Sequence, residues 1–284
     1  MYLCGQTEPF PSKKMISEAE NQALRERFAP EGSLLRRQQE RMFQMLLWLD
    51  AVCRRHHIRY WLGSGTLIGA VRHGGFIPWD DDVDLEFPKE DYQRLLQVLP
   101  EECEGTDYAL QTHETDPGYV FTYAKLRDRR SYIEETNHYD RRCRLQGLFI
   151  DLFFVEEIPA PLHWLSNRTI GHIFKIMRNP EYNDQQILRK TSKLFELNVR
   201  YIYPVLRWIG RLFPQKVLHY GLGIPYESTR RPEDLFPLST IDFEGFPFMA
   251  PHDPAAYLTR LYGDFRRMPD LESIRLHTAK VEIY

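Results

Sequence analysis

Four aspartates within five residues, Asp80, Asp81, Asp82 and Asp84, are the strongest chemical signal in the chain. From Asp82 to Phe87 polar and apolar side chains alternate, which predicts a half-buried strand with Asp82 and Asp84 on one face. Two carboxylates held side by side repel each other, and a divalent cation removes that repulsion. Oxygen ligands favour Mg²⁺ or Mn²⁺ over zinc. A solvated loop or a calcium-binding turn stays open, although the spacing does not fit an EF-hand.

The segment before these aspartates predicts an anion site. Residues 59–62 are predicted to form a short strand, and a brief predicted helix over 67–72 ends at the Gly-Gly pair 74–75. Free backbone N–H groups at a Gly- and Ser-rich helix start bind phosphate. The candidate phosphate contacts here are Gly63, Ser64, Gly65 and Thr66. An ordinary turn is the alternative.

A second strand is predicted over residues 147–155, where Asp151 interrupts an otherwise apolar run. An ionised carboxylate in such a strand is costly unless a cation or hydrogen-bond donors meet it. Asp151 is therefore either a buried aspartate paired with arginine or backbone N–H groups, or a third metal ligand beside Asp82 and Asp84.

Aromatic and β-branched residues predict a further strand over 119–127, on which Lys125 and Arg127 share a face. Two cations in line on a strand guard a solvent-facing edge in some proteins. Near a nucleotide they neutralise the diphosphate. The residues alone leave both interpretations open.

The run GTLIGAVRHGGFIPWDDDVDL, residues 65–85, resembles the signature of the LicD family of phosphotransferases, which is related to fukutin and fukutin-related protein. Further segments match that family in its order: the Lys-x-Arg pair, the GxxIDxF context of Asp151, and residues 243–264, FEGFPFMAPHDPAAYLTRLYGD. Residues 162–231 match no motif. The family belongs to the polymerase-β-like nucleotidyltransferase superfamily.

This resemblance implies an α/β (mixed α+β) fold with a mixed, mostly antiparallel sheet flanked by helices and a helical C-terminal part. It implies that Asp82, Asp84 and Asp151 form the metal site, and that Asp151 is the candidate base for the acceptor. The family favours a nucleotide-binding role for the cationic pair, so the expected further phosphate contacts are Arg72, His73, Lys125 and Arg127. Candidate substrate contacts near the motifs are Trp61, Trp79, Asp80, Asp81 and Tyr123.

The resemblance also implies a reaction. A CDP-linked alcohol such as CDP-choline would pass its alcohol phosphate to a glycan or lipid-linked glycan hydroxyl and release CMP. Two alternatives stay open: transfer of a nucleotide with release of pyrophosphate, and nucleotide binding without catalysis. Recognition of choline would need an aromatic cage, and the sequence does not identify its members.

Composition sets limits on partners and location. The chain has 284 residues, 43% of them hydrophobic, and a net charge of −3, which argues against nucleic acid as the main partner. Its four widely spaced cysteines predict neither a zinc site nor a disulfide framework. No uncharged run approaches the ~20 residues of a membrane span, and the first residues lack the apolar core of a signal peptide. We therefore expect a cytoplasmic protein, either free or at the inner face of the membrane.

Three regions are predicted: an N-terminal extension over 1–32, a catalytic core over 33–160 and a helical region over 161–284. Apolar spacings of three and four residues predict a long helix from Ser33 to about His57. Residues 201–213 combine aromatic side chains with Arg207 and Arg211. This segment either lies in the plane of a membrane or is buried between helices.

Overall fold

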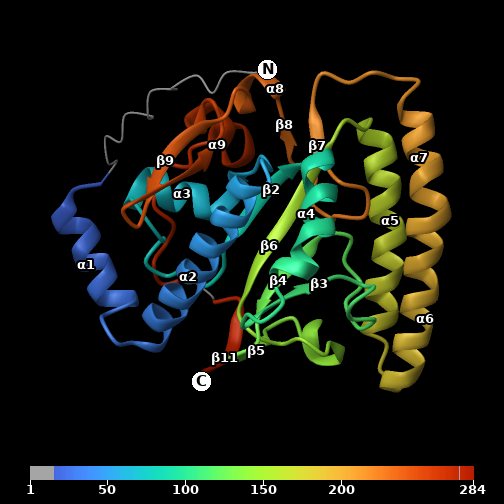
Figure 1. Ribbon diagram of the computed structural model, residues 1–284, viewed down its shortest axis with the longest axis horizontal. Helices are drawn as coiled ribbons and strands as arrows, with labels where there is room; N and C mark the ends of the chain where they lie inside the picture. Colours follow the sequence, from blue (N-terminus) through green and yellow to red (C-terminus); the bar gives the residue numbers. More distant parts are fainter. Residues whose placement is uncertain (1–15, 275) are drawn as a thin grey trace.

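A mixed central sheet organises the computed structural model, which describes residues 16–274 and 276–284 (Figure 1). Strand β2 (Asp84–Pro88) pairs in parallel with β6 (Phe149–Glu156), and every other described pair in this sheet is antiparallel. The order is β1 (Trp61–Leu62), β2, β6, β4 (Ala124–Asp128) and β3 (Tyr108–Gln111), while β7 (Leu218–Tyr220) pairs with β6 and β8 (Thr229–Arg230) with β7. The predicted mixed, mostly antiparallel sheet is confirmed.

Strand β6 is the centre of this sheet because its side chains are covered on both faces. All eight of its residues are buried, as its nearly continuous apolar sequence predicts. Val155 pairs with Pro88 on one edge and with Tyr220 on the other, so β4 and β7 share the edge of β6 that faces away from β2. Residues from distant segments therefore meet along β6.

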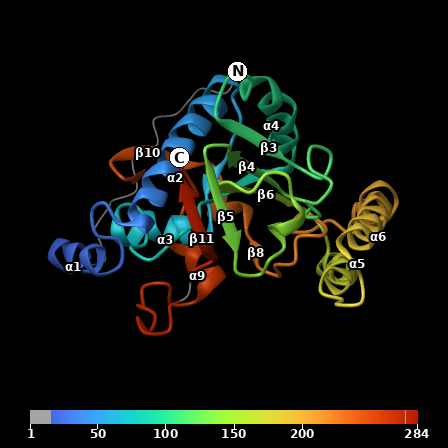
Figure 2. The same ribbon diagram turned by 90° about the horizontal axis from the view of Figure 1, so that it is seen from below.

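Two long helices cover one face of the sheet (Figures 1 and 2). Helix α2 (Leu34–Arg55) begins at Ser33, whose side chain accepts a hydrogen bond from the Arg36 N–H. Its predicted apolar stripe is buried, apart from a partly exposed Leu35. Helix α4 (Lys89–Glu102) follows β2 directly, with Pro88 as its N-cap. The apolar residues of both helices pack against the same face of the sheet.

Helices of residues 160–210 project from the sheet as a separate layer (Figures 1 and 2). Helix α5 (Ala160–Met177) packs against α6 (Asp184–Leu197), which continues through a π-helical turn, η2 (Asn198–Ile202), into α7 (Tyr203–Gly210). These helices lie in the part of the chain that was predicted to be helical from residue 161 onward. None of the described helices is long and apolar enough to cross a bilayer.

The region expected to be helical also supplies strands. Besides β7 and β8 it contains helix α8 (Pro232–Leu235), strands β9 (Ser239–Phe243) and β10 (Phe246–Ala250), and helix α9 (Pro254–Tyr262). Its last strand, β11 (Thr278–Ile283), pairs with β5 (Ser131–Glu135), which is followed by the short helix η1 (Asp140–Arg142). This half of the chain is therefore part of the same packed body as the core.

The predicted N-terminal extension is described from residue 16 onward, and the expectations for Cys4 and for the first residues lie outside the described part. Within it, α1 (Glu18–Phe28) packs on the core, because Asn21 Nδ2 donates to the His73 carbonyl oxygen at 2.9 Å. The extension is thus held by a buried hydrogen bond.

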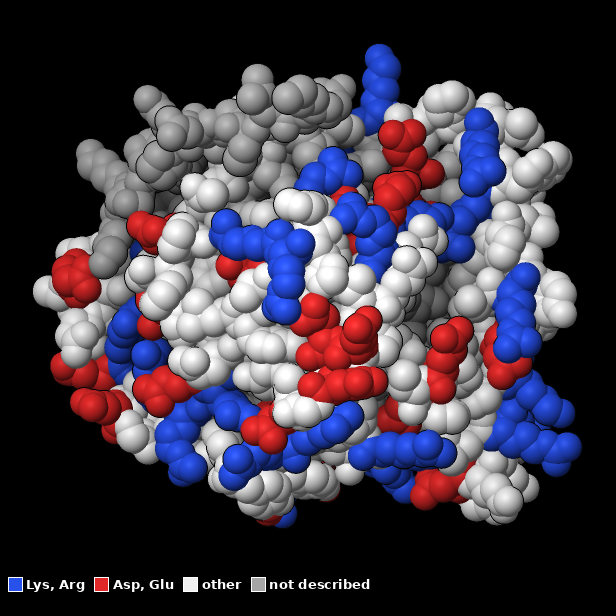
Figure 3. Space-filling view, in the orientation of Figure 1, with Lys and Arg blue, Asp and Glu red and all other residues white. Residues whose placement is uncertain are grey.

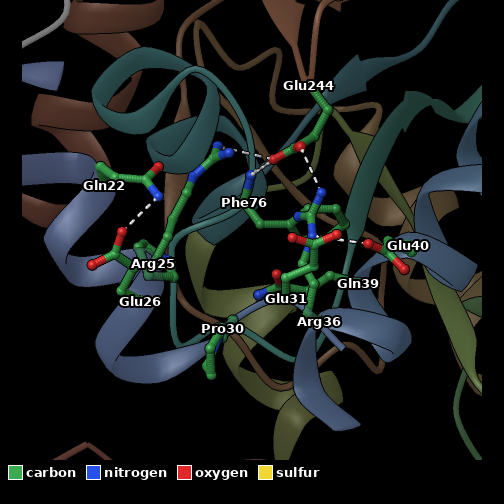
Figure 4. Close-up of a pocket in the computed structure, with 12 residues that line it drawn as sticks. Gln22, Arg25, Glu26, Pro30, Glu31, Arg36, Gln39, Glu40, Phe76 and Glu244 are labelled. Atoms are coloured by element: carbon green, nitrogen blue, oxygen red, sulfur yellow. Dashed lines mark hydrogen bonds and ion pairs between the residues drawn. The ribbon is translucent and has the colours of Figure 1, made fainter. Parts of the chain in front are cut away.

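Glu244, in the turn between β9 and β10, explains a glycine of the 65–85 motif (Figure 4). Its carboxylate accepts hydrogen bonds from Arg25 at 3.2 Å, Arg36 at 3.3 Å and the Phe76 N–H at 3.1 Å. A Cβ atom at Gly75 would approach Glu244 Oε1 to 2.0 Å. A larger residue at position 75 would therefore displace this carboxylate from its partners.

Candidate active site

Strand pairing brings the predicted acidic residues together. Asp84 lies opposite Asp151 across β2 and β6, and Asp151 lies opposite Lys125 across β6 and β4. These three side chains line one cleft of about 750 Å³ together with Asp80 and Asp82. Residues from three separate stretches of sequence therefore face the same space.

The crowded carboxylates disfavour their own ionisation. The pKa values of Asp80, Asp82 and Asp84 are raised, in each case chiefly by burial, and neighbouring aspartates add to the effect. Burial also raises the pKa of Asp151 to about 6, against the opposing influence of Lys125. A cation in the cleft would relieve this unbalanced charge.

The donor atoms suit a hard divalent cation. Asp151 Oδ1 is buried and accepts no hydrogen bond of good geometry, although Lys125 Nζ lies 3.2 Å away. Carboxylate oxygens of this kind bind Mg²⁺ and Mn²⁺. Among the described residues, no three His, Cys, Asp or Glu side chains are arranged so that they could hold a metal ion as they stand. The cleft therefore suits a divalent cation because its ligand atoms are carboxylate oxygens and because its negative charge is in excess.

Helix α3 (Ser64–His73) begins at the same cleft. Its N-cap is Gly63, and no side chain caps its first N–H groups, which leaves them for an anion. Ser64 and Gly65 line the cleft. Thr66 is buried, and its Oγ1 accepts a hydrogen bond from the Asp84 N–H at 2.9 Å. Thr66 therefore ties the helix start to the aspartate strand.

Lys125 and Arg127 have different environments. The solvent-edge interpretation is wrong, because β4 lies between β3 and β6. Lys125 lines the cleft, with Nζ 3.4 Å from Glu135 Oε1. Arg127 is 1% exposed, and its Nε donates to Gln111 Oε1 at 2.7 Å. A ligand in the cleft can thus reach Lys125, whereas Arg127 is enclosed by protein groups.

Arg72 and His73, at the C-terminal end of α3, lie outside the cleft. Arg72 donates to the Phe265 carbonyl oxygen at 3.2 Å and to His73 Nε2 at 2.9 Å. His73 Nδ1 lies 2.8 Å from Asn21 Oδ1. Both side chains are buried. In place of the predicted phosphate contact, these residues hold α1 and the segment after α9 against α3.

Three predicted substrate contacts also point into the protein. Trp61 is buried and donates to Glu86 Oε2 at 3.0 Å. Trp79 packs edge-on against a ring of α1. Asp81 is buried and accepts hydrogen bonds from the Thr278 N–H at 2.8 Å and from its hydroxyl at 2.6 Å. Asp81 thus anchors the C-terminal strand beneath the cleft.

Glu86 is a residue of the site that sequence reasoning missed. Its fully buried carboxylate accepts hydrogen bonds from Tyr220 Oη at 2.7 Å, Tyr257 Oη at 2.8 Å and the Arg230 guanidinium at 2.5 and 2.9 Å. Tyr220 Oη also lies 3.4 Å from Ser64 Oγ. The C-terminal segments are therefore connected to the helix start. The available signal was the continuation of the period-two polar pattern beyond Asp84.

The C-terminal half supplies much of the remaining cleft wall. Tyr123, a predicted contact, lies 4.4 Å from Phe153 between ring centroids, and Phe153 lies 5.9 Å from Tyr226. His277 directly precedes strand β11, and its Nε2 lies 3.8 Å from Asp82 Oδ2. No sequence pattern identified Tyr226 or His277, because neither belongs to a motif near the aspartates.

Comparison with known proteins identifies the family of the chain. Residues 57–206 match the family model LicD/FKTN/FKRP, nucleotidyltransferase domain. The chain is 30% identical over 266 residues to the lipopolysaccharide cholinephosphotransferase LicD of Haemophilus influenzae, covering 86% of this chain and 95% of that protein. It is 62% identical over 41 residues to the human ribitol 5-phosphate transferase FKRP, covering 14% of this chain and 8% of FKRP. The resemblance inferred from the motifs is confirmed: the chain belongs to the LicD/FKTN/FKRP family and is a phosphotransferase.

Proposed function

We propose that the protein moves a phospho-alcohol, with phosphocholine as the first candidate, from a CDP-linked donor to a hydroxyl of a cell-surface glycan and releases CMP. One observation carries this proposal: a single cleft combines four aspartates, an uncapped helix N-terminus and a lysine. The relative from Haemophilus influenzae, a cholinephosphotransferase acting on lipopolysaccharide, supports the choice of donor and acceptor class.

Different residues of the cleft would bind the metal ion and the phosphates of the donor. Asp82 and Asp84, with Asp151, would hold Mg²⁺ or Mn²⁺, which when bound stabilises charge on the attacking and leaving oxygens. Backbone N–H groups at the start of α3 bind a phosphate of the donor. Lys125 neutralises the diphosphate, because it lines the cleft and its Nζ lies 3.2 Å from Asp151 Oδ1.

Asp151 is the candidate general base. It faces the cleft from the centre of the sheet, where Lys125 Nζ lies 3.2 Å from its Oδ1. A carboxylate held in this way can take the proton of the acceptor hydroxyl as the new phosphate ester forms. Arg127 does not line the cleft. One of its terminal nitrogens lies 3.4 Å from Glu135 Oε1, the oxygen that also pairs with Lys125.

Aromatic rings beside the carboxylates favour a cationic alcohol. Tyr226 lines the cleft with half of its surface exposed, and Tyr123 and Phe153 continue the same wall. The faces of such rings attract a quaternary ammonium group. Phosphocholine is therefore favoured over uncharged alcohols such as ribitol.

Product analysis tests this proposal. The full chain is incubated with Mg²⁺, a lipopolysaccharide acceptor and, in separate reactions, CDP-choline, CDP-ethanolamine or CDP-ribitol. We expect CMP together with phospho-alcohol on the acceptor, most rapidly with CDP-choline. Asp84→Asn should abolish the reaction, whereas Asp242→Asn, on an exposed position of β9, should not. Release of pyrophosphate from nucleoside triphosphates, without CMP from any CDP-alcohol, would instead establish nucleotidyl transfer.

We also propose that the protein acts in the cytoplasm, either free or at the inner face of the membrane.

A further inference from the structure

Helix α7 and the turn before it are apolar on two opposite sides. The inner side buries Tyr203, Leu206 and Gly210. The outer side exposes large apolar residues to between 55 and 66% of their surface: Tyr201, Val205, Trp208 and Leu212. Their spacing of four, three and four residues places them on one stripe of the helix. Within the described chain, this stripe has no covering element.

The beginning of α5 lies beside the end of α7 and also exposes apolar side chains. A Cβ atom at Gly210 would lie 2.7 Å from Ile158 Cδ1 and 3.6 Å from Leu162 Cδ1, so the end of α7 lies beside the start of α5. At that start Trp164 and Leu165 are 51 and 41% exposed. We use the name outer surface for six exposed residues of this layer: Trp164 and Leu165 of α5, Tyr201 of η2, Val205 and Trp208 of α7, and Leu212 just after α7. Concentrated apolar exposure of this kind marks an interaction site.

The charge of this layer identifies the partner. Residues 160–216 contain ten Lys and Arg but three Asp and Glu, a net charge of +7 in a chain whose total is −3. In Figure 3, Lys and Arg side chains gather along the right-hand edge, over α5 and α6. Arg168 lies 5.0 Å from the Trp164 ring. Arg211 and Lys216 are exposed, and no described acidic side chain pairs with either.

We propose that the outer surface docks on an anionic lipid bilayer. The Trp and Leu side chains would enter the boundary between headgroups and acyl chains, and the surrounding Arg and Lys would meet lipid phosphates. An uncharged protein partner would not account for the charge of +7 around the apolar stripe. The chain needs no membrane-spanning helix for this mode of attachment.

Docking would place the cleft near the membrane. Trp164 and Phe174 both lie on helix α5, and Phe174 lines the cleft. The ten residues of helix between them span about 15 Å. A lipid-linked glycan acceptor would thus be held close to the transferring residues. This consequence rests on the proposed function, whereas the docking itself does not.

Vesicle binding tests the proposal without any substrate. The full chain is sedimented with phosphatidylcholine vesicles that contain or lack phosphatidylglycerol. We expect binding to the anionic vesicles and its loss at high salt. Trp208→Ser combined with Leu212→Ser should weaken that binding about tenfold or more. The matched control, Leu34→Ser with Tyr284→Ser, removes side chains that are 48 and 70% exposed elsewhere and should bind as the wild type does.

A second pair of variants tests the charge. Arg211→Glu with Lys216→Glu should weaken binding about fivefold for each positive charge removed, whereas Arg37→Glu with Arg129→Glu should leave it unchanged. Failure of the wild type to bind anionic vesicles, or equal losses in the control variants, would overturn the proposal. So would a wild-type dimer that Trp208→Ser with Leu212→Ser makes monomeric, because a second copy would then cover the surface. CMP release with a soluble acceptor, measured in parallel, should be unaffected, which separates this test from that of the proposed function.

Discussion

The buried carboxylate of Glu86 offers the sharpest test of how the site is held together. It joins β2 to Tyr220, Arg230 and Tyr257 from three later segments. The Arg230 guanidinium is itself fully buried. Glu86→Gln preserves the shape of the side chain but removes its negative charge, so the Arg230 cation stays buried without a counter-charge.

The magnitude follows from the burial of both partners. Removing one partner of a buried ion pair costs about 3–5 kcal/mol. In a protein of this size about 1 kcal/mol lowers Tm by about 2–4 °C, so we expect Glu86→Gln to lower Tm by about 10 °C. Arg230→Met should cost a similar amount. The double variant removes both charges, and it should therefore be more stable than the sum of the two single losses predicts.

Thermal and urea unfolding of the four proteins measure these free energies as a double-mutant cycle. Glu90→Gln, on an exposed position at the start of α4, is the matched control and should unfold like the wild type. If Glu86→Gln also unfolds like the wild type, or if the two single losses simply add, the ion pair does not hold these segments together and the reasoning is refuted.

Four further predictions concern the cleft and the packing around it. Asp84→Asn should lower turnover about a hundredfold or more with an equal or higher Tm, because repulsion between carboxylates falls; near-normal rates would exclude the metal role. Asp151→Asn should keep CDP-choline binding in calorimetry with Mg²⁺ while transfer collapses; early melting with normal specific activity would show a structural role instead. Tyr226→Leu should raise KM for CDP-choline about fivefold and leave that for CDP-ribitol unchanged; equal effects would argue against a choline contact. Burial lowers the pKa of His73 from 6.5 to about 3. Below pH 6.5 the unfolded chain therefore takes up a proton at this residue that the folded protein does not, and the free energy of unfolding falls by about 2 kcal/mol at pH 5. His73→Gln should remove that part of the pH dependence of urea unfolding.

Local patterns were sufficient for the elements that carry the aspartates. The apolar run around Asp151 became β6, which is buried on both faces as predicted. The alternation after Asp82 became β2, which begins at Asp84. The expected half-burial of that strand is wrong, because Glu86 on its polar face is enclosed by Arg230, Tyr220 and Tyr257. Gly74 ends α3 with a φ of +69°, as expected for a left-handed C-cap. Such signals depend on a few neighbouring residues, and tertiary packing reinforces them here.

The environment of a side chain was harder to predict than its position on a strand or helix. Periodicity correctly placed Lys125 and Arg127 on one strand face, but partners from other segments decide that one opens onto the cleft and the other is enclosed. The strand predicted over 119–127 begins at Ala124. Arg72 and His73 lie within a motif shared with the family, and spacing alone cannot distinguish a ligand from a packing residue whose partners are distant in sequence.

The sequence by itself determined the family, the acidic strand, the second buried aspartate and the helix start beside them. The tertiary structure alone decided that β2 and β6 pair in parallel with Asp84 opposite Asp151, that Glu86 gathers the C-terminal segments, and that β7 and β11 come from a region expected to be helical. The physical reason is the range of the forces. Local propensity acts over a few residues, whereas strand register and side-chain burial depend on which distant faces exclude water together.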